Sequence, residues 1–169
     1  MNDVSWQHVE QDIVSWLESA YPNEGCGLIV EADGVVRWIP CENLADKYHQ
    51  LDPIAFPRTS RTFYIVSPKE FLAAERRGET VRIIVHSHAD VGDYFSDEDR
   101  AAALLPALGP DEHPEPLFPG VDYLVVSVRN GHADHATTFR FDDEQREFEP
   151  CQSYEFGRKS SLTAGLLTG

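Results

Sequence analysis

The sequence predicts a single α/β domain, and two features of the chain support this prediction. Its 169 residues, 41% of them hydrophobic, are enough for one sizeable core and too few for two ordinary domains. Segments with the two-residue period of strands alternate along the chain with segments that have the period of helices. This order of elements indicates a mixed sheet with helices packed on it.

The chain begins with a predicted helix that is followed by a β-hairpin. Apolar side chains recur near helical spacing within residues 4–20, and Pro22 ends this amphipathic segment. Residues 26–31 and 35–39 flank an Ala-Asp-Gly turn, as expected of a hairpin. The hairpin would hold Glu24 at the mouth of its first strand.

The middle of the chain predicts a loop, a strand, a helix and a second strand. Residues 41–61 lack a clean period and predict a long connecting loop with at most a short helical turn. Long loops are often functional, although an ordinary solvated loop is equally consistent with this composition. Residues 62–66 predict a strand, residues 67–77 open with a Ser-Pro-Lys-Glu helix start, and residues 81–88 are a β-branched strand.

The last third predicts a loop, a hairpin and a tail. Residues 109–120 are rich in proline, glycine and acids and predict a loop, while residues 122–128 and 133–141 flank an Asn-Gly turn. The segment 152–169 is rich in Ser, Gly and Thr. We therefore expect a domain over residues 1–151 and a flexible C-terminal tail over residues 152–169.

Two imidazoles, a hydroxyl and a carboxylate fall within fourteen positions of the chain. His86 and His88 end a predicted strand, and residues two apart on a strand project from the same face. Ser96 begins a Ser-x-x-acid pattern that is typical of a helix start, which places Asp99 in the first helical turn. If the intervening loop folds back, Asp99 lies near the two histidines.

These residue types are ligands that zinc accepts. Two neutral imidazoles and one carboxylate leave the fourth position of a tetrahedral site open for water, as in catalytic zinc sites. Taken singly, each residue also has an ordinary interpretation: a polar histidine at a strand end, Ser96 as a helix cap, and Asp99 as an acid favoured by the helix dipole. Their joint spacing favours the metal site.

The same residues resemble the motif of the JAMM, or MPN-plus, zinc metalloproteases. That motif is a distant upstream glutamate, then His-Ser/Thr-His, seven residues, Ser, two residues and Asp, and this chain matches it. The resemblance implies that His86, His88 and Asp99 bind zinc, that Ser96 is the motif serine, and that Glu24 is the upstream glutamate.

The resemblance extends over about residues 5–149 and implies the fold of this family. That fold is a single-domain α/β sandwich with a mixed, curved sheet between helices, and it resembles the fold of cytidine deaminases. A deaminase site itself is excluded, because His-x-Glu with a distant Pro-Cys-x-x-Cys is absent and Pro150-Cys151 is followed by Gln-Ser-Tyr. Ala89 stands where family members often have proline, so we expect a looser loop there.

The implied reaction is hydrolysis of an amide or isopeptide bond. Zinc lowers the pKa of its bound water to about 7, so that a nearby carboxylate can take a proton from that water. The resemblance implies that Glu24 is this base and delivers the proton to the leaving amine, while Ser96 helps to stabilise the oxyanion. Without the resemblance, Glu24 would be interpreted as an exposed turn residue.

Charge and cysteine content exclude other classes of protein. A net charge of −15 argues against DNA or RNA as a partner, because nucleic-acid binding depends on cationic side chains. Three widely spaced cysteines, Cys26, Cys41 and Cys151, suggest neither a disulfide framework nor a zinc knuckle. The sequence has no long apolar run and no signal-peptide pattern at its start, so we expect a cytoplasmic protein without a membrane partner.

Three functions are consistent with the motif. In the first, which bacterial single-domain members resemble most, a zinc peptidase cuts after the C-terminal glycine of a small β-grasp protein, ubiquitin-like or sulfur-carrying. The tail of that protein would add as a strand beside the metal, at residues 62–66 or the loop after His88. The second is a peptidoglycan or phage-tail-associated peptidase, which would commonly carry a second hydrolase domain that this sequence does not show. The third is a non-catalytic MPN scaffold, against which the complete ligand set argues.

Overall fold

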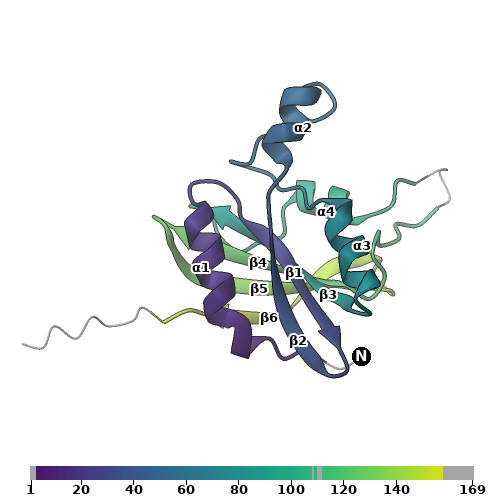
Figure 1. The fold of residues 1–169 in the computed structure, drawn as a ribbon. Coiled ribbons are helices and arrows are strands. Elements are labelled where there is room, and N and C mark those ends of the chain that lie inside the picture. Colours follow the sequence, from purple (N-terminus) through teal and green to yellow (C-terminus); the bar gives the residue numbers. More distant parts are fainter. Residues whose placement is uncertain (1–2, 108, 110–111, 158–169) are drawn as a thin grey trace, which may run out of the picture.

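A computed structural model describes residues 3–107, 109 and 112–157 of the chain (Figure 1). Its order of elements follows the order predicted from the sequence, with the differences given below. The helices are η1 (Gln7–Val9, a 3-10 turn), α1 (Glu10–Ala20), α2 (Ala45–Leu51), α3 (Pro68–Arg76) and α4 (Asp97–Ala103). The strands are β1 (Cys26–Ala32), β2 (Val35–Cys41), β3 (Thr80–Ala89), β4 (Asp122–Arg129), β5 (His132–Asp142) and β6 (Glu147–Glu155).

The strands form one mixed sheet in the order β2-β1-β3-β4-β5-β6. All neighbours pair antiparallel except β3 and β4, which run parallel. The predicted α/β fold with a mixed sheet is therefore confirmed. Both edge strands, β2 and β6, belong to hairpins, while the central strand β3 carries the two histidines of the motif.

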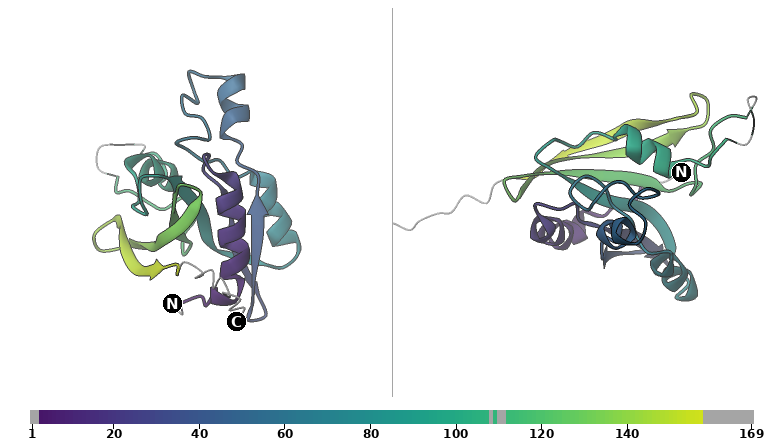
Figure 2. Two further views of the ribbon diagram at one scale, coloured as in Figure 1. Left: turned by 90° about the vertical axis from the view of Figure 1, so that its left-hand side faces the viewer. Right: turned by 90° about the horizontal axis from the view of Figure 1, so that it is seen from above.

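Helices cover both faces of the sheet, because the central strands are apolar on both sides. On one face Ile13 and Leu17 of α1 pack against Ile29 and Val85. On the other face Ala74 of α3 and Ala103 of α4 join a cluster that also contains Leu28, Ile84 and Phe95. The view from above shows α1 and α4 on opposite sides of the strands (Figure 2). Alternation along β3 thus directs the side chains of residues 84, 86 and 88 toward the face that carries α4.

The predicted strand at residues 62–66 is wrong. This segment belongs to no strand, because its backbone bonds to the start of α2 and not to the sheet. The carbonyl of Ile65 accepts from the N–H of Leu44 at 2.9 Å, and the side chain of Asn43 bonds to both Phe63 and Ile65. The loop predicted over residues 41–61 contains the two-turn helix α2, which projects beyond the end of the sheet (Figure 1).

The predicted domain boundary at residue 151 falls inside a strand. β6 continues to Glu155 and pairs with β5, so the sheet includes residues that the sequence assigns to the tail. The strand escapes prediction because only Phe148 is buried and because Pro150 interrupts it. Proline is tolerated here since β6 is an edge strand with a register shift opposite Thr138 and Phe139. The remainder of the predicted tail, residues 158–169, lies outside the described residues.

Two further expectations concern the cysteines and the membrane. Cys26 and Cys41 are buried free thiols that face each other across β1 and β2, while Cys151 is exposed. No helix within the described part of the chain has the length and apolar character needed to cross a bilayer.

Candidate metal centre

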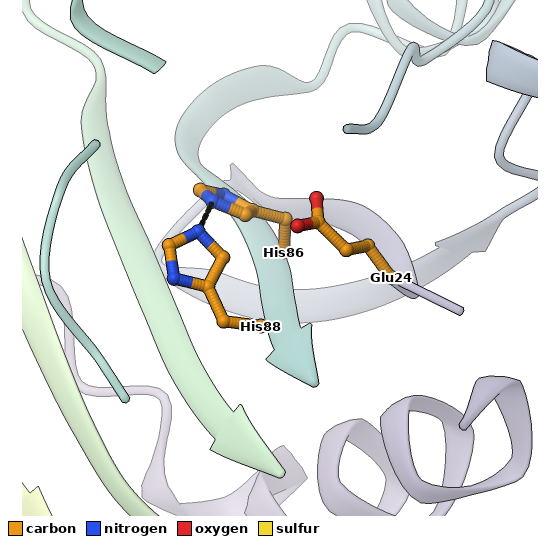
Figure 3. Close-up of side chains that lie close together, drawn as sticks. All are labelled: Glu24, His86 and His88. Atoms are coloured by element: carbon orange, nitrogen blue, oxygen red, sulfur yellow. Dashed lines mark hydrogen bonds between the residues drawn. The ribbon is translucent and has the colours of Figure 1, made fainter. Parts of the chain in front are cut away.

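The C-terminal end of β3 presents two buried imidazoles on the same face of the sheet. His86 is 0% exposed and His88 is 4% exposed. Their Nε2 atoms lie 3.2 Å apart, and Figure 3 shows this contact together with the carboxylate of Glu24, which points toward His86. The alternation of strand side chains, which the sequence predicted, therefore brings both rings to a single point.

Helix α4 brings a carboxylate to the same point. Asp99 Oδ1 lies 3.3 Å from His86 Nε2, and Asp99 Oδ2 lies 3.3 Å from His88 Nε2. Asp99 is fixed by a capping box: its N–H donates to Ser96 Oγ at 3.1 Å, and its Oδ2 accepts from the Ser96 N–H at 3.0 Å and hydroxyl at 2.6 Å. The hydrogen bonds at the start of α4 therefore also orient Asp99, the third potential ligand.

The neighbours of the two rings define how each can bind a metal. His88 Nδ1 lies 3.0 Å from the carbonyl of Gly92, and because a carbonyl only accepts, Nδ1 carries a hydrogen. In the neutral ring Nε2 therefore presents its lone pair. The ring of Tyr64 stacks on His86 at a centroid distance of 4.2 Å, and that of Tyr94 meets His88 edge-on at 5.1 Å. Both imidazoles are thus held in place by aromatic contacts.

Burial and charge shift the protonation of these groups in different directions. Burial lowers the pKa of His86, which favours the neutral ring that a metal requires. Burial acts the same way on His88, but the hydrogen bond to Asp99, the charges of Glu24 and Asp99 and the hydrogen bond to Gly92 together outweigh it and raise the pKa of His88. Burial alone would raise the pKa of Asp99, yet the adjacent imidazoles hold it well below its usual range. Metal binding would therefore displace protons.

Glu24 lies beside the imidazoles, and hydrogen bonds to its backbone hold it there. Its N–H donates to the carbonyl of Ser60 at 2.7 Å, and its carbonyl accepts from the side-chain amide of Asn43 at 2.9 Å. The side chain is 6% exposed, and Oε2 has no hydrogen-bond partner among the described residues. Burial raises the pKa of Glu24 to about 8. A buried carboxylate oxygen without a hydrogen-bond donor destabilises the fold unless it binds a proton, a water molecule or a cation.

The serine between the two histidines connects Glu24 to β3. Ser87 Oγ accepts from the N–H of Gly25 at 2.9 Å, and the Ser87 N–H donates to the carbonyl of Gly25 at 2.9 Å. Because Ser87 points to the opposite face from its neighbours, it fixes the Glu24 segment without occupying the metal side. This role follows from tertiary contact and was not predicted.

The spacing of the donor atoms suits a bound metal ion. Three atoms bound to one tetrahedral zinc at about 2.0–2.1 Å stand roughly 3.3–3.4 Å from one another. The Nε2 atoms of His86 and His88 lie 3.2 Å apart, and each lies 3.3 Å from a different carboxylate oxygen of Asp99. The donor atoms of Glu24 and the two histidines also lie within 4.8 Å of one another. Acceptor atoms converge here from β3, from α4 and from the loop before β1, and a cation would satisfy them together.

The structure thus brings together all five residues that the sequence singled out, Glu24, His86, His88, Ser96 and Asp99. The sequence reasoning missed the supporting residues Asn43, Asp46 and Ser60. Asp46 accepts from the N–H and hydroxyl of Ser60, at 2.8 and 2.7 Å, and so anchors the carbonyl that bonds to Glu24. Asn43, two residues before α2, accepts from the N–H of Ala45 at 3.0 Å, and an asparagine at a helix start is a signal that could have been recognised.

The loop after β3 is more firmly held than the replacement of proline by Ala89 suggested. Ala89 belongs to β3, and Asp90 accepts from the Tyr21 hydroxyl at 2.8 Å and from the Asn130 N–H at 2.8 Å. Asp93 accepts from the Thr137 hydroxyl at 2.7 Å. The carboxylates of Asp90 and Asp93 therefore both have structural partners.

A cavity of about 730 Å³ lies away from these residues, at the turn between β1 and β2. It is lined by Asp3, Val4, Ser5, His8, Glu31, Gly34, Val35, Val36 and Arg82. None of these residues belongs to the donor set, and the cavity offers no cluster of metal-binding side chains. We therefore take the histidines of β3, not this cavity, as the chemical centre.

Comparisons with known proteins agree with this geometry. The chain is 35% identical over 97 residues to tail tip assembly protein K of Escherichia phage N15, a match that covers 56% of this chain and 35% of the phage protein. The chain thus spans about a third of the length of that relative. It also resembles two solution structures, a protein from Desulfitobacterium hafniense (TM-score 0.56, 18% identity, 86% of this chain and 87% of the other) and one from Salinibacter ruber (TM-score 0.52, 23% identity, 88% and 87%).

The two solution structures support the fold alone. The family is shown by a separate match: the model of the prokaryotic homologs of the JAB domain covers residues 7–142, which contain every element from η1 to α4, together with β4 and β5. On this match, and with the motif residues gathered at one point, the chain belongs to the prokaryotic homologs of the JAB domain, within the JAB/MPN family.

Proposed function

We propose that this protein is a zinc-dependent peptidase that hydrolyses an amide bond after the C-terminal glycine of a ubiquitin-like or sulfur-carrier protein. The observation that carries the proposal is the cluster of His86, His88 and Asp99 next to the buried carboxylate of Glu24. In this cluster the two Nε2 atoms lie 3.2 Å apart and each lies 3.3 Å from one oxygen of Asp99. JAB/MPN members are often metal-dependent hydrolases, which is consistent with this arrangement.

His86, His88 and Asp99 would hold the metal, and Glu24 would act without binding it. Nε2 of His86 and His88 and the carboxylate of Asp99 are the ligands; zinc, when bound, acidifies a coordinated water and polarises a carbonyl. Oε2 of Glu24 accepts a proton and later delivers it to the leaving nitrogen, a use for an atom that otherwise lacks a donor. Ser96 orients Asp99 through its hydroxyl. We propose that during turnover the same hydroxyl donates to the developing oxyanion instead.

The surroundings of the site suit a glycine-rich tail. Tyr64 stacks on His86 and Tyr94 meets His88, so two phenol rings flank the metal ligands. A segment without side chains can pass between such rings more easily than a bulky one. We propose that the tail of a β-grasp protein enters here, between residues 62–66 and the loop after His88, in an extended conformation.

The test combines metal content with cleavage. We would measure zinc by mass spectrometry in the wild type, in His86→Ala and His88→Ala, and in His132→Ala, a control for an exposed histidine on β5. The substrate is a sulfur-carrier protein extended past its terminal glycine. One zinc per chain in the wild type and the control, none in the other variants, and chelator-sensitive cleavage are expected. An absence of zinc under replete conditions would leave the non-catalytic scaffold as the function.

The similarity to the phage tail tip assembly protein favours a second candidate function. In this alternative the same metal centre cleaves peptides of the bacterial cell wall. It predicts that zinc-loaded protein cleaves peptidoglycan stem peptides and leaves the extended carrier protein intact.

A further inference from the structure

The chain turns back on itself directly after the end of β3 that carries the two histidines. Ala89 is the last residue of β3, and Asp90 follows it with a φ of +64°, in the left-handed region. Gly92 continues the turn at a φ of +121°, and its carbonyl lies 3.0 Å from Nδ1 of His88. The path of this turn therefore determines whether His88 has an acceptor for a hydrogen on Nδ1.

The left-handed conformation of Asp90 is unfavourable for a residue with a side chain. Residues other than glycine keep this conformation only where neighbouring contacts hold them, although aspartate and asparagine tolerate it better than most. A glycine would adopt the turn freely, as Gly92 does. The turn itself therefore does not explain why a carboxylate stands at this position.

Both oxygens of this carboxylate are bound by other elements. Oδ2 of Asp90 accepts from the hydroxyl of Tyr21, at the C-terminal end of α1, at 2.8 Å. Oδ1 accepts at 2.8 Å from the N–H of Asn130, in the turn between β4 and β5, and the N–H of Asp90 donates to the carbonyl of Val128 at 2.9 Å. Asp90 thus ties the turn after β3 to α1 and to the hairpin of β4 and β5.

Fixing this turn has a chemical consequence for His88. The Gly92 carbonyl holds a hydrogen on Nδ1, so the neutral ring turns the lone pair of Nε2 toward the other donor atoms. If the turn moved away, the hydrogen could lie on either nitrogen, and the ring would bind a metal less well. Losing such a partner of the second ring nitrogen typically weakens metal binding by about 10- to 100-fold.

We propose that Asp90 is a positioning residue for the metal centre. By fixing the turn after β3 it keeps the Gly92 carbonyl on His88, and it thereby sets the affinity of the site for zinc. This inference rests on the proposed function, because it requires that His88 binds a metal. Asp90 is exposed at the surface and acts through the backbone of the turn, not as a ligand.

The experiment compares two aspartates that share this conformation. Asp90→Gly keeps the left-handed turn and removes the carboxylate, whereas Asp90→Asn keeps the shape and one oxygen acceptor. Asp33→Gly is the matched control, because Asp33 is also exposed, at a φ of +50°, but lies in the turn between β1 and β2 at the opposite end of the sheet. We would measure zinc affinity by competition with a chelator, and the tautomer of His88 by NMR of the ring nitrogens in the zinc-free protein.

Asp90→Gly should bind zinc about 10-fold more weakly than the wild type, the lower end of the range for such partners, because Asp93 still anchors the loop to Thr137. Its His88 ring should show a mixture of tautomers, where the wild type shows the hydrogen on Nδ1. Tyr21→Phe, which leaves Asp90 in place and removes one of its donors, should weaken zinc binding by a smaller factor.

The two remaining variants should stay close to the wild type. Asp33→Gly should bind zinc with unchanged affinity. Asp90→Asn should retain most of the affinity, because its amide can still accept from the N–H of Asn130 and donate to the oxygen of Tyr21. Unchanged zinc affinity in Asp90→Gly would overturn the role of Asp90 and leave the metal centre standing. A wild type that binds no zinc would overturn the proposed function and this inference together.

Discussion

The N–H of Gly25 donates to the side-chain oxygen of Ser87 at 2.9 Å, and the N–H of Ser87 donates to the carbonyl of Gly25 at the same distance. This reciprocal pair joins the residue after Glu24 to the residue between His86 and His88. The proposed base and two proposed ligands are therefore parts of one rigid unit, although 62 positions separate Gly25 from Ser87.

Replacing Ser87 by alanine tests this connection. Ser87→Ala leaves the buried N–H of Gly25 without its acceptor, which should destabilise the fold by about 1–3 kcal/mol. We expect zinc to remain bound while kcat falls, because Glu24 loses its fixed position. Denaturant unfolding, zinc content and cleavage measure the three effects. Ser87→Thr keeps the acceptor and should retain most of the activity; a fully active Ser87→Ala protein would show that the link does not position Glu24.

Glu24→Gln separates proton transfer from metal binding. The amide has nearly the shape of the carboxylate but cannot accept the proton, so kcat should fall by about 10²- to 10⁴-fold. Zinc content should stay at that of the wild type, because the three proposed ligands are untouched. Glu149→Gln, on the exposed side of β6, is the control for loss of a carboxylate. Turnover by Glu24→Gln at the wild-type rate would be incompatible with its role as the base.

Asp46 is expected to make the stability depend on pH in the acid range. Hydrogen bonds from the backbone and hydroxyl of Ser60 lower the pKa of Asp46 below its usual value near 4. A carboxyl whose pKa is lowered by folding stabilises the protein above its unfolded pKa, and this contribution is lost as the pH falls through the folded pKa. The melting temperature of Asp46→Asn should therefore be lower than that of the wild type at pH 7, and the difference between the two should shrink toward pH 2. A difference in melting temperature that does not change with pH would contradict this role of Asp46.

The absence of a side chain at Gly27 leaves room for the indole ring of Trp38 against β1. A Cβ at this position would lie 2.2 Å from the ring of Trp38 and 2.5 Å from the carbonyl of Ile39, and a backbone carbonyl within a strand pair cannot easily move. Gly27→Ala should cost about 1–3 kcal/mol of unfolding free energy through overpacking. Gly157→Ala, where the added carbon would meet nothing within 4 Å, should be close to neutral. Equal denaturation midpoints for the two variants would show that β2 can shift to accommodate the methyl group.

Local patterns predicted the elements that bear the site. The two-residue period placed His86 and His88 on one face of β3, and the Ser-x-x-acid pattern placed Asp99 in the first turn of α4. Both are local rules, in which a side chain's direction depends only on neighbours within a few residues. The same locality explains the error at residues 62–66, since a β-branched, aromatic segment was assigned to a strand although its hydrogen bonds go to Asn43 and Leu44.

The sequence by itself determined the α/β class, the ligand strand, the capped ligand helix and the identity of the five motif residues, because each rests on periodicity, capping or a motif read along the chain. Only the tertiary structure decided the clamp on Glu24 by Asn43 and Ser60, the place of β6 at the sheet edge, and the contact between Arg58 and Glu98. These join residues 19 to 40 positions apart, or pair strands whose neighbours are chosen by burial of the whole sheet. No local pattern records such contacts, because they form only when the chain closes around its core.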